Sequence, residues 1–77
     1  MHKLSNISGI EVVKLLSKLG FYPARQKGSH VILTRQTSEG KKYVVVPLHN
    51  EIDGGTLLSI IRQAGLKREE FLKLLEE

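Results

Sequence analysis

The chain has 77 residues, a length that gives one small domain with a single compact core, and we expect residues 1–77 to form that one domain. Apolar residues make up 40% and charged residues 26% of the sequence, as in soluble globular proteins, and no apolar run approaches the roughly 20 residues that cross a membrane. The sequence has no cysteine for disulfides and no apolar secretory signal, so we expect a cytoplasmic protein without membrane contacts.

Residues 8–20 have the pattern of a capped amphipathic helix. Ser8 and Glu11 fit a capping box, in which each side chain accepts a hydrogen bond from the other residue's backbone N–H. Gly20 can adopt the left-handed conformation that ends a helix. The apolar residues recur at helical spacing and predict one buried face, made of Val12, Leu15, Leu16 and Leu19.

The next three segments, residues 21–26, 29–35 and 41–47, are rich in β-branched and aromatic residues and are separated by turn formers. Gly28 is expected to form the turn between the first two segments. Gly40 can take the positive φ that closes a hairpin loop within "QTSEG". Pro23 is tolerated in a strand at a sheet edge or a bulge. The three segments therefore predict an antiparallel meander.

Two helices are predicted after the strands. Asp53 and Thr56 supply cap chemistry ahead of the apolar face of residues 57–64, and Gly65 ends that helix. Residues 67–77 can form a short third helix, although Lys67 stands where a Ser, Thr or Asp cap is usual. The order predicts an α+β fold: a two-layer sandwich with helices on one face of a three-stranded antiparallel sheet, plus a short C-terminal helix.

The net charge of +4 is concentrated in residues 21–48. The acids and bases of the other residues cancel. Such a segment favours contact with a polyanion, either nucleic acid or an acidic protein, and the alternative is a surface charge that only aids solubility. The segment holds one acid, Glu39, and five bases: Arg25, Lys27, Arg35, Lys41 and Lys42.

His30 follows the turn residues Gly28 and Ser29 and begins the second predicted strand. We expect the more uniformly apolar face of this strand to meet the helices, which leaves His30 exposed and able to exchange protons near neutral pH. The alternative is a structural histidine hydrogen-bonded in the core. The predicted open face carries His30, Ile32 and Thr34, and the helix-facing side carries Val31, Leu33 and Arg35.

The sequence gives no support for a metal or a nucleotide cofactor, and none is expected. His2, His30 and His49 lack the short paired spacings of a zinc site. No phosphate-binding P-loop or dinucleotide-binding glycine motif is present. The pair Gly54 and Gly55 ahead of a helix is more typical of a tight turn than of an anion site.

Three stretches, "GFYPARQKGSHVIL", "YVVVPLHNEIDGGTLLSIIRQAGL" and "REEFLKLL", resemble HicA-type toxins, the mRNA interferases of type II toxin-antitoxin modules. The most specific parts are the "KGSH" turn, the "VP-L-H" strand end and the helix from "GTL" to "QAGL". The resemblance implies a fold similar to a double-stranded RNA-binding domain, with His30 catalytic. It also implies cleavage of mRNA, often on translating ribosomes, and a HicB-like antitoxin that masks His30.

The chemistry expected is metal-independent cleavage, in which the RNA 2′-hydroxyl attacks the adjacent phosphate. His30 would be the single catalytic histidine, acting as general base or acid. The second proton carrier is left open among Ser29, Lys27 and water, and His49 is expected to position a loop. Tyr22 and Tyr43 could stack on bases. The residues expected to bind phosphate are Lys27, Arg25, Arg35, Lys41, Lys42 and Ser29.

Two other functions stay open on the sequence: a non-catalytic RNA-binding module with a basic sheet face, and an interaction domain that meets an acidic protein. Double-stranded RNA-binding domains place lysines at the start of their last helix. Residues 54–58 are "GGTLL" in this chain, so a pure duplex-binding module is disfavoured.

Overall fold

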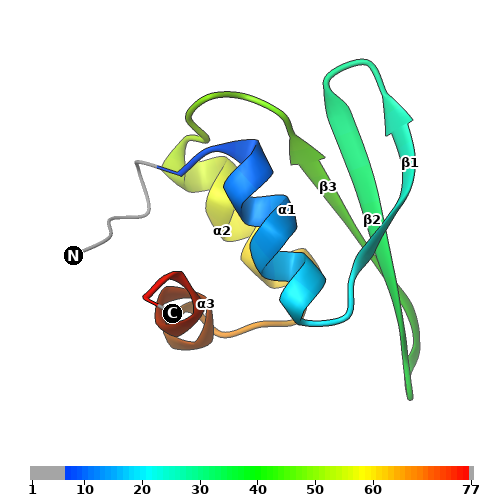
Figure 1. Ribbon diagram of the computed structural model, residues 1–77. Coiled ribbons are helices and arrows are strands. Elements are labelled where there is room, and N and C mark those ends of the chain that lie inside the picture. Colours follow the sequence, from blue (N-terminus) through cyan, green and yellow to red (C-terminus); the bar gives the residue numbers. More distant parts are fainter. Residues whose placement is uncertain (1–6, 77) are drawn as a thin grey trace.

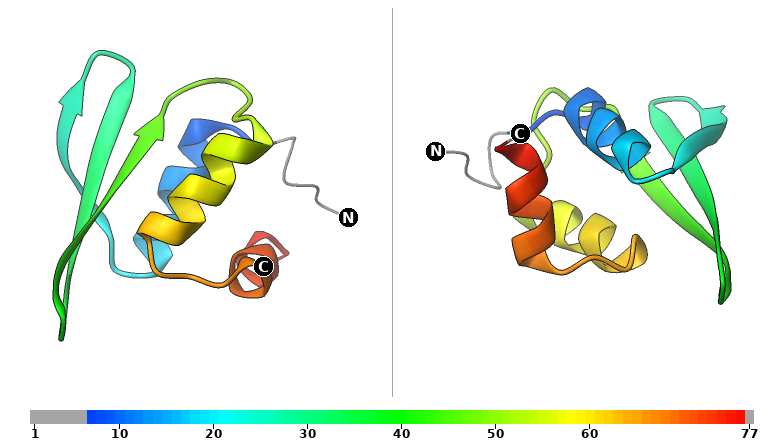
Figure 2. Two further views of the ribbon diagram at one scale, coloured as in Figure 1. Left: turned by 180° about the vertical axis from the view of Figure 1, so that it is seen from behind. Right: turned by 60° about the horizontal axis from the view of Figure 1, so that its bottom comes forward.

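The computed structural model describes residues 7–76, which form three helices and three strands. Their order is α1 (Gly9–Lys18), β1 (Tyr22–Lys27), β2 (His30–Thr37), β3 (Gly40–Pro47), α2 (Gly54–Gln63) and α3 (Arg68–Leu75). The strands form one antiparallel sheet in the order β1-β2-β3. Helices α1 and α2 lie side by side on one face of this sheet, as Figures 1 and 2 show, and no helix among residues 7–76 covers the other face. The predicted two-layer α+β fold is confirmed.

Helix α1 begins and ends as predicted. The Glu11 N–H donates to the Ser8 hydroxyl at 3.2 Å, and the Ser8 N–H donates to the Glu11 carboxylate at 3.0 Å. At the other end Gly20 has a φ of 95°, and the Phe21 N–H donates back to the Leu16 carbonyl. This Schellman-type ending turns Phe21 into the core, where its side chain is 2% exposed, so β1 starts one residue later than predicted.

Strands β2 and β3 pair through a two-residue turn, Ser38 and Glu39, which is shorter than the predicted loop. Thr37 pairs with Gly40, and the Thr37 hydroxyl donates to the Gly40 carbonyl at 2.7 Å. Gly40 has the expected positive φ, 113°. The longer pairing fixes the whole register and places His30 opposite Pro47.

Strand β1 is the edge of the sheet next to β2. It contains a bulge between Pro23 and Arg25, where the register with β2 shifts. The bulge and the edge position accommodate Pro23, which has no N–H to donate. Both helices of the second layer contact β3, and α3 contacts α2.

The core lies between the sheet and the helices. Val31 and Leu33 of β2 face it with exposed fractions of 6% and 0%, so the predicted helix-facing side of β2 is correct. The C-terminal helix contributes Phe71, which is fully buried. The other apolar residues buried in this core are Ile7, Val12, Leu15, Leu16, Phe21, Val44, Val46, Ile52, Leu57, Ile60, Ile61 and Ala64.

Helices α2 and α3 have unequal caps. The Asp53 carboxylate accepts hydrogen bonds from the Thr56 hydroxyl at 2.7 Å and from the Thr56 N–H at 3.1 Å, and these bonds lower the pKa of Asp53. Lys67, at the start of α3, has no side-chain acceptor, and its N–H donates to the Glu70 carboxylate at 2.9 Å. No helix formed by residues 7–76 has the length and apolar character needed to cross a membrane.

Gly9, the first residue of α1, packs directly against the end of β3. A Cβ at this position would overlap the Pro47 carbonyl and lie 2.8 Å from the Leu48 Cα. The Gly9 N–H also donates to the His49 carbonyl at 2.9 Å. Only glycine allows this close approach, so Gly9 joins the start of α1 to the segment that follows β3.

We predict that Gly9→Ala destabilises the protein by about 1–3 kcal/mol, because the new methyl group has no room against the backbone of Pro47 and Leu48. Gly54→Ala is the matched control. Gly54 also begins a helix, but nothing lies within 4 Å of an added Cβ, so this change should leave stability equal or slightly higher. Urea denaturation of both variants measures the difference. Equal stability of the two variants would contradict the contact.

Candidate active site on the open sheet face

His30 begins β2 on the face of the sheet that the helices do not cover. The turn before it is formed by Gly28, with a φ of 59°, and Ser29. Across the strands, His30 pairs with Lys27 of β1 and with Pro47 of β3. His30 is exposed, so the alternative of a structural histidine in the core is wrong.

His49 lies beside His30. The ring centres of the two histidines are 6.4 Å apart, and the rings meet edge to face at 69°. His49 is exposed and follows Pro47 by two residues, which returns it to the same side of the chain as Pro47. At this separation the two imidazoles are close enough to act on one bound group.

Two backbone hydrogen bonds hold the segment that carries His49. The Leu48 N–H donates to the Ser29 carbonyl at 2.6 Å, and the His49 carbonyl accepts from the Gly9 N–H at 2.9 Å. Ser29 thus fixes the site through its backbone, and its exposed side chain remains a predicted phosphate contact. The two histidines are positioned by the sheet and by α1, which restricts their separation.

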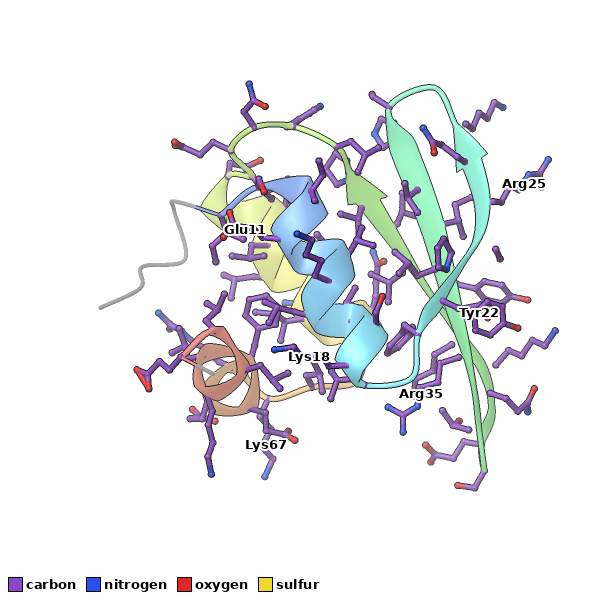
Figure 3. All side chains as sticks on the ribbon, in the orientation of Figure 1. Glu11, Lys18, Tyr22, Arg25, Arg35 and Lys67 are labelled. Atoms are coloured by element: carbon purple, nitrogen blue, oxygen red, sulfur yellow. The ribbon has the colours of Figure 1, made fainter. Side chains whose placement is uncertain are left out.

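Two of the predicted cations lie next to the histidines. Lys27 is directly opposite His30, and Arg25 is opposite Ile32, two pairs farther along the β1–β2 ladder. Both cationic side chains are exposed, and Figure 3 shows Arg25 directed away from the helices. A phosphate at His30 would therefore meet Lys27 first and Arg25 next.

The other three predicted cations lie farther away. Lys41 pairs with Gln36, which is six residues from His30 along β2. At about 3.3 Å per residue, Gln36 is about 20 Å from His30. Arg35 and Lys42 pair with each other and project on the helix side of the sheet. The Arg35 guanidinium is 5.8 Å from the centre of the Phe21 ring, and Figure 3 shows Arg35 beside the end of α1. The structure therefore groups Lys27 and Arg25 with His30 and separates Arg35, Lys41 and Lys42 from it.

The face also carries a buried threonine. Thr34 lies on the predicted open side of β2 but is only 4% exposed, and its hydroxyl donates to the Lys42 carbonyl at 3.1 Å. Tyr22 and Tyr43 pair with Thr34 from the two neighbouring strands. Side chains on this face, rather than the helices, therefore cover Thr34.

The histidines lie on an open surface and not in a pocket. A groove of about 520 Å³ runs between α1 and β1, but its lining includes neither His30 nor His49. Among residues 7–76, no three His, Asp or Glu side chains gather where they could hold a metal ion. An open surface with two imidazoles and adjacent cations is suited to one phosphate group of a long polymer.

His49 is the site residue whose place next to His30 sequence reasoning missed. The signal was present in the hairpin: a two-residue turn at Ser38 and Glu39 pairs His30 with Pro47, and His49 is then the next residue on the same side. Gly9 is a second missed residue. Nothing in its local sequence shows that it contacts the end of β3.

Comparison with protein families finds a match. Residues 9–66 match the family model described as the HicA toxin of bacterial toxin-antitoxin systems. This range is more than half of the chain and includes the turn of His30, the hairpin and His49. A search of curated proteins finds no significant match.

Proposed function

Because the chain belongs to the HicA toxin family of bacterial toxin-antitoxin systems, we propose that it is an endoribonuclease that cleaves mRNA with His30 as a catalytic residue. The observation that supports this proposal most strongly is the pair of exposed imidazoles, His30 and His49, beside Lys27 on the uncovered sheet face. In the cell, loss of mRNA would arrest translation and growth.

The reaction is an attack of the RNA 2′-hydroxyl on the adjacent phosphorus. A bond forms between the 2′-oxygen and phosphorus, the bond from phosphorus to the 5′-oxygen breaks, and the products are a 2′,3′-cyclic phosphate and a 5′-hydroxyl. One group must take the proton of the 2′-hydroxyl, and another must give a proton to the leaving 5′-oxygen. His30 and His49 share these two roles in our proposal, so the second proton carrier is a histidine that was expected only to position a loop.

The cations stabilise the charge that develops on the phosphate. The attacking step increases negative charge on the nonbridging oxygens, and a fixed cation beside them favours the transition state. Lys27 is opposite His30 and is the first candidate for this role, with Arg25 holding the next phosphate. Arg35, Lys41 and Lys42 would act on RNA only at a distance from the reacting bond.

The toxin has an antitoxin partner, as its family implies. We assign this partner as a HicB-like protein whose acidic groups cover His30 and His49. Both imidazoles are exposed in the isolated chain, so the toxin needs an external protein to mask them. In this proposal the toxin acts in the cytoplasm. Its substrate there is mRNA, including mRNA on translating ribosomes.

We predict that His30→Ala and His49→Ala each reduce RNA cleavage by about 10²-fold or more, the lower range for losing a general acid or base. Both side chains are exposed, so the melting temperature should change little. The double variant should be little worse than either single variant, because the two histidines serve one reaction. The measurements are cleavage of a labelled mRNA and thermal unfolding of each variant.

The pH profile separates a proton carrier from a residue that positions a loop. An acid and a base acting together give a bell-shaped dependence of kcat/KM on pH, and His49→Ala should remove one limb. If the pH dependence of kcat/KM kept both limbs in His49→Ala, His49 would be a positioning residue and not a proton carrier. Full cleavage by folded His30→Ala would refute the proposed catalytic site.

We predict that Lys27→Ala and Arg25→Ala weaken RNA binding and each flatten its salt dependence by about 0.7 in the log–log slope, the value for one phosphate contact of a single strand. Arg35→Ala and Lys42→Ala should have smaller effects, because these side chains lie on the helix side of the sheet. Lys73→Ala, in α3, is the control distant from the site. Binding titrations at several salt concentrations measure the slopes, and equal slopes for Lys27→Ala and Lys73→Ala would contradict the assignment.

A further inference from the structure

Two tyrosines form an exposed aromatic row on the face that carries His30. Tyr22 of β1 and Tyr43 of β3 are both paired with Thr34 of β2, so the three side chains form one line across the sheet. The tyrosines are 55% and 56% exposed, whereas Thr34 between them is 4% exposed. The two tyrosine side chains therefore flank and cover Thr34 while leaving much of their own surface to solvent. Figure 3 shows Tyr22 on the side of the sheet opposite the helices.

The sheet does not need these rings for its core. The core lies on the other face, and neither Tyr22 nor Tyr43 belongs to it. Tyr22 and Tyr43 are on the two outer strands, with β2 between them, so they are not a directly opposed cross-strand pair. Exposed aromatic rings on an open sheet are the arrangement on which unpaired nucleobases stack.

The surroundings favour an RNA strand over a neutral ligand. Apolar side chains of Ile32 and Val45, the latter 41% exposed, form the next row of the ladder toward His30. Arg25 and Lys27 follow along β1 from the tyrosine row to the histidines. Among the paired residues of this face there is no carboxylate. A phosphate backbone can thus follow cations while its bases contact the rings.

The row is close enough to act together with the catalytic histidines. Thr34 is four residues from His30 on the same strand, about 13 Å at about 3.3 Å per residue. This separation lets nucleotides near the cleaved bond reach the tyrosines. A paired base cannot offer its flat surface to a ring, because the neighbouring base pairs already cover it.

We propose that Tyr22 and Tyr43 are a stacking site for unpaired bases of single-stranded RNA next to the bond cleaved at His30. The proposal rests on the assignment of the chain as a ribonuclease, and it adds that the substrate must be single-stranded beside the cleavage point. In this proposal the two rings, and not the cations, cause the protein to prefer single-stranded RNA over duplex RNA.

The test uses the two tyrosines as their own reporters. The chain contains two tyrosines and no tryptophan, so its tyrosine fluorescence comes only from Tyr22 and Tyr43. In full-length His30→Ala, which binds without cleaving, a short mixed-sequence single-stranded RNA should quench this emission, and the duplex of the same sequence should not. Quenching needs no substitution in the rings, so the result does not depend on how a tyrosine variant folds.

Substitutions then measure the contribution of each ring. In the His30→Ala background, Tyr22→Ala and Tyr43→Ala should each weaken binding of the single strand by about 5- to 100-fold, the range for losing one stacked base. Tyr22→Phe and Tyr43→Phe should bind within about two-fold of the parent, since a phenyl ring also stacks. Leu58→Ala is the control, because Leu58 is an exposed apolar residue of α2, at 43%, away from this face.

The outcomes separate this proposal from the ribonuclease assignment. RNA binding without quenching, or equal binding by the alanine variants, would overturn the stacking site while the wild-type protein still cleaved RNA. Normal RNA binding by the alanine variants, together with lost affinity for the cognate antitoxin, would also overturn it and make the tyrosines protein contacts. Failure of the wild-type protein to cleave RNA would instead refute the ribonuclease assignment.

Discussion

The hydrogen bond from the Leu48 N–H to the Ser29 carbonyl, 2.6 Å long, joins the residue after β3 to the turn before β2. It continues the β2–β3 pairing past His30 and Pro47, so the sheet itself directs the chain at His49. Gly9 holds the same segment from the side of α1, through its N–H and through the absence of a side chain. The separation of the two histidines depends on these contacts, because neither imidazole is packed in the core.

One face of the sheet is packed against the helices, and the other is exposed to solvent. The helices cover one face, where Val31, Leu33, Val44 and Val46 are almost completely buried and supply stability. The other face holds the histidines, the two tyrosines and the cations Arg25, Lys27 and Lys41, all of them exposed. Substitution of these exposed residues should therefore cost little stability. A polymer substrate suits such a surface, since it can contact several rows of the sheet at once.

The sequence predicted those features that depend on local chemistry. The capping residues Ser8 and Asp53 start their helices, and the buried pair Val31 and Leu33 shows that His30 faces outward. The antiparallel pairing of the strands was predicted, but its register was not. The hairpin turn is two residues long, and only this register brings His49 to His30. The strand register also separates the basic residues that are clustered in the sequence, because Arg35 and Lys42 face the helices and not the open face.

If His30 and His49 cleave RNA by using its own 2′-hydroxyl, as we propose, the chemical ends of the products will show it most directly. Purified toxin should cut a labelled single-stranded RNA in excess EDTA, leaving 2′,3′-cyclic phosphate and 5′-hydroxyl ends. The same oligonucleotide with 2′-deoxy sugars throughout should stay intact, because it lacks the nucleophile. Products with 5′-phosphate ends, or cleavage of the deoxy oligonucleotide, would contradict the mechanism.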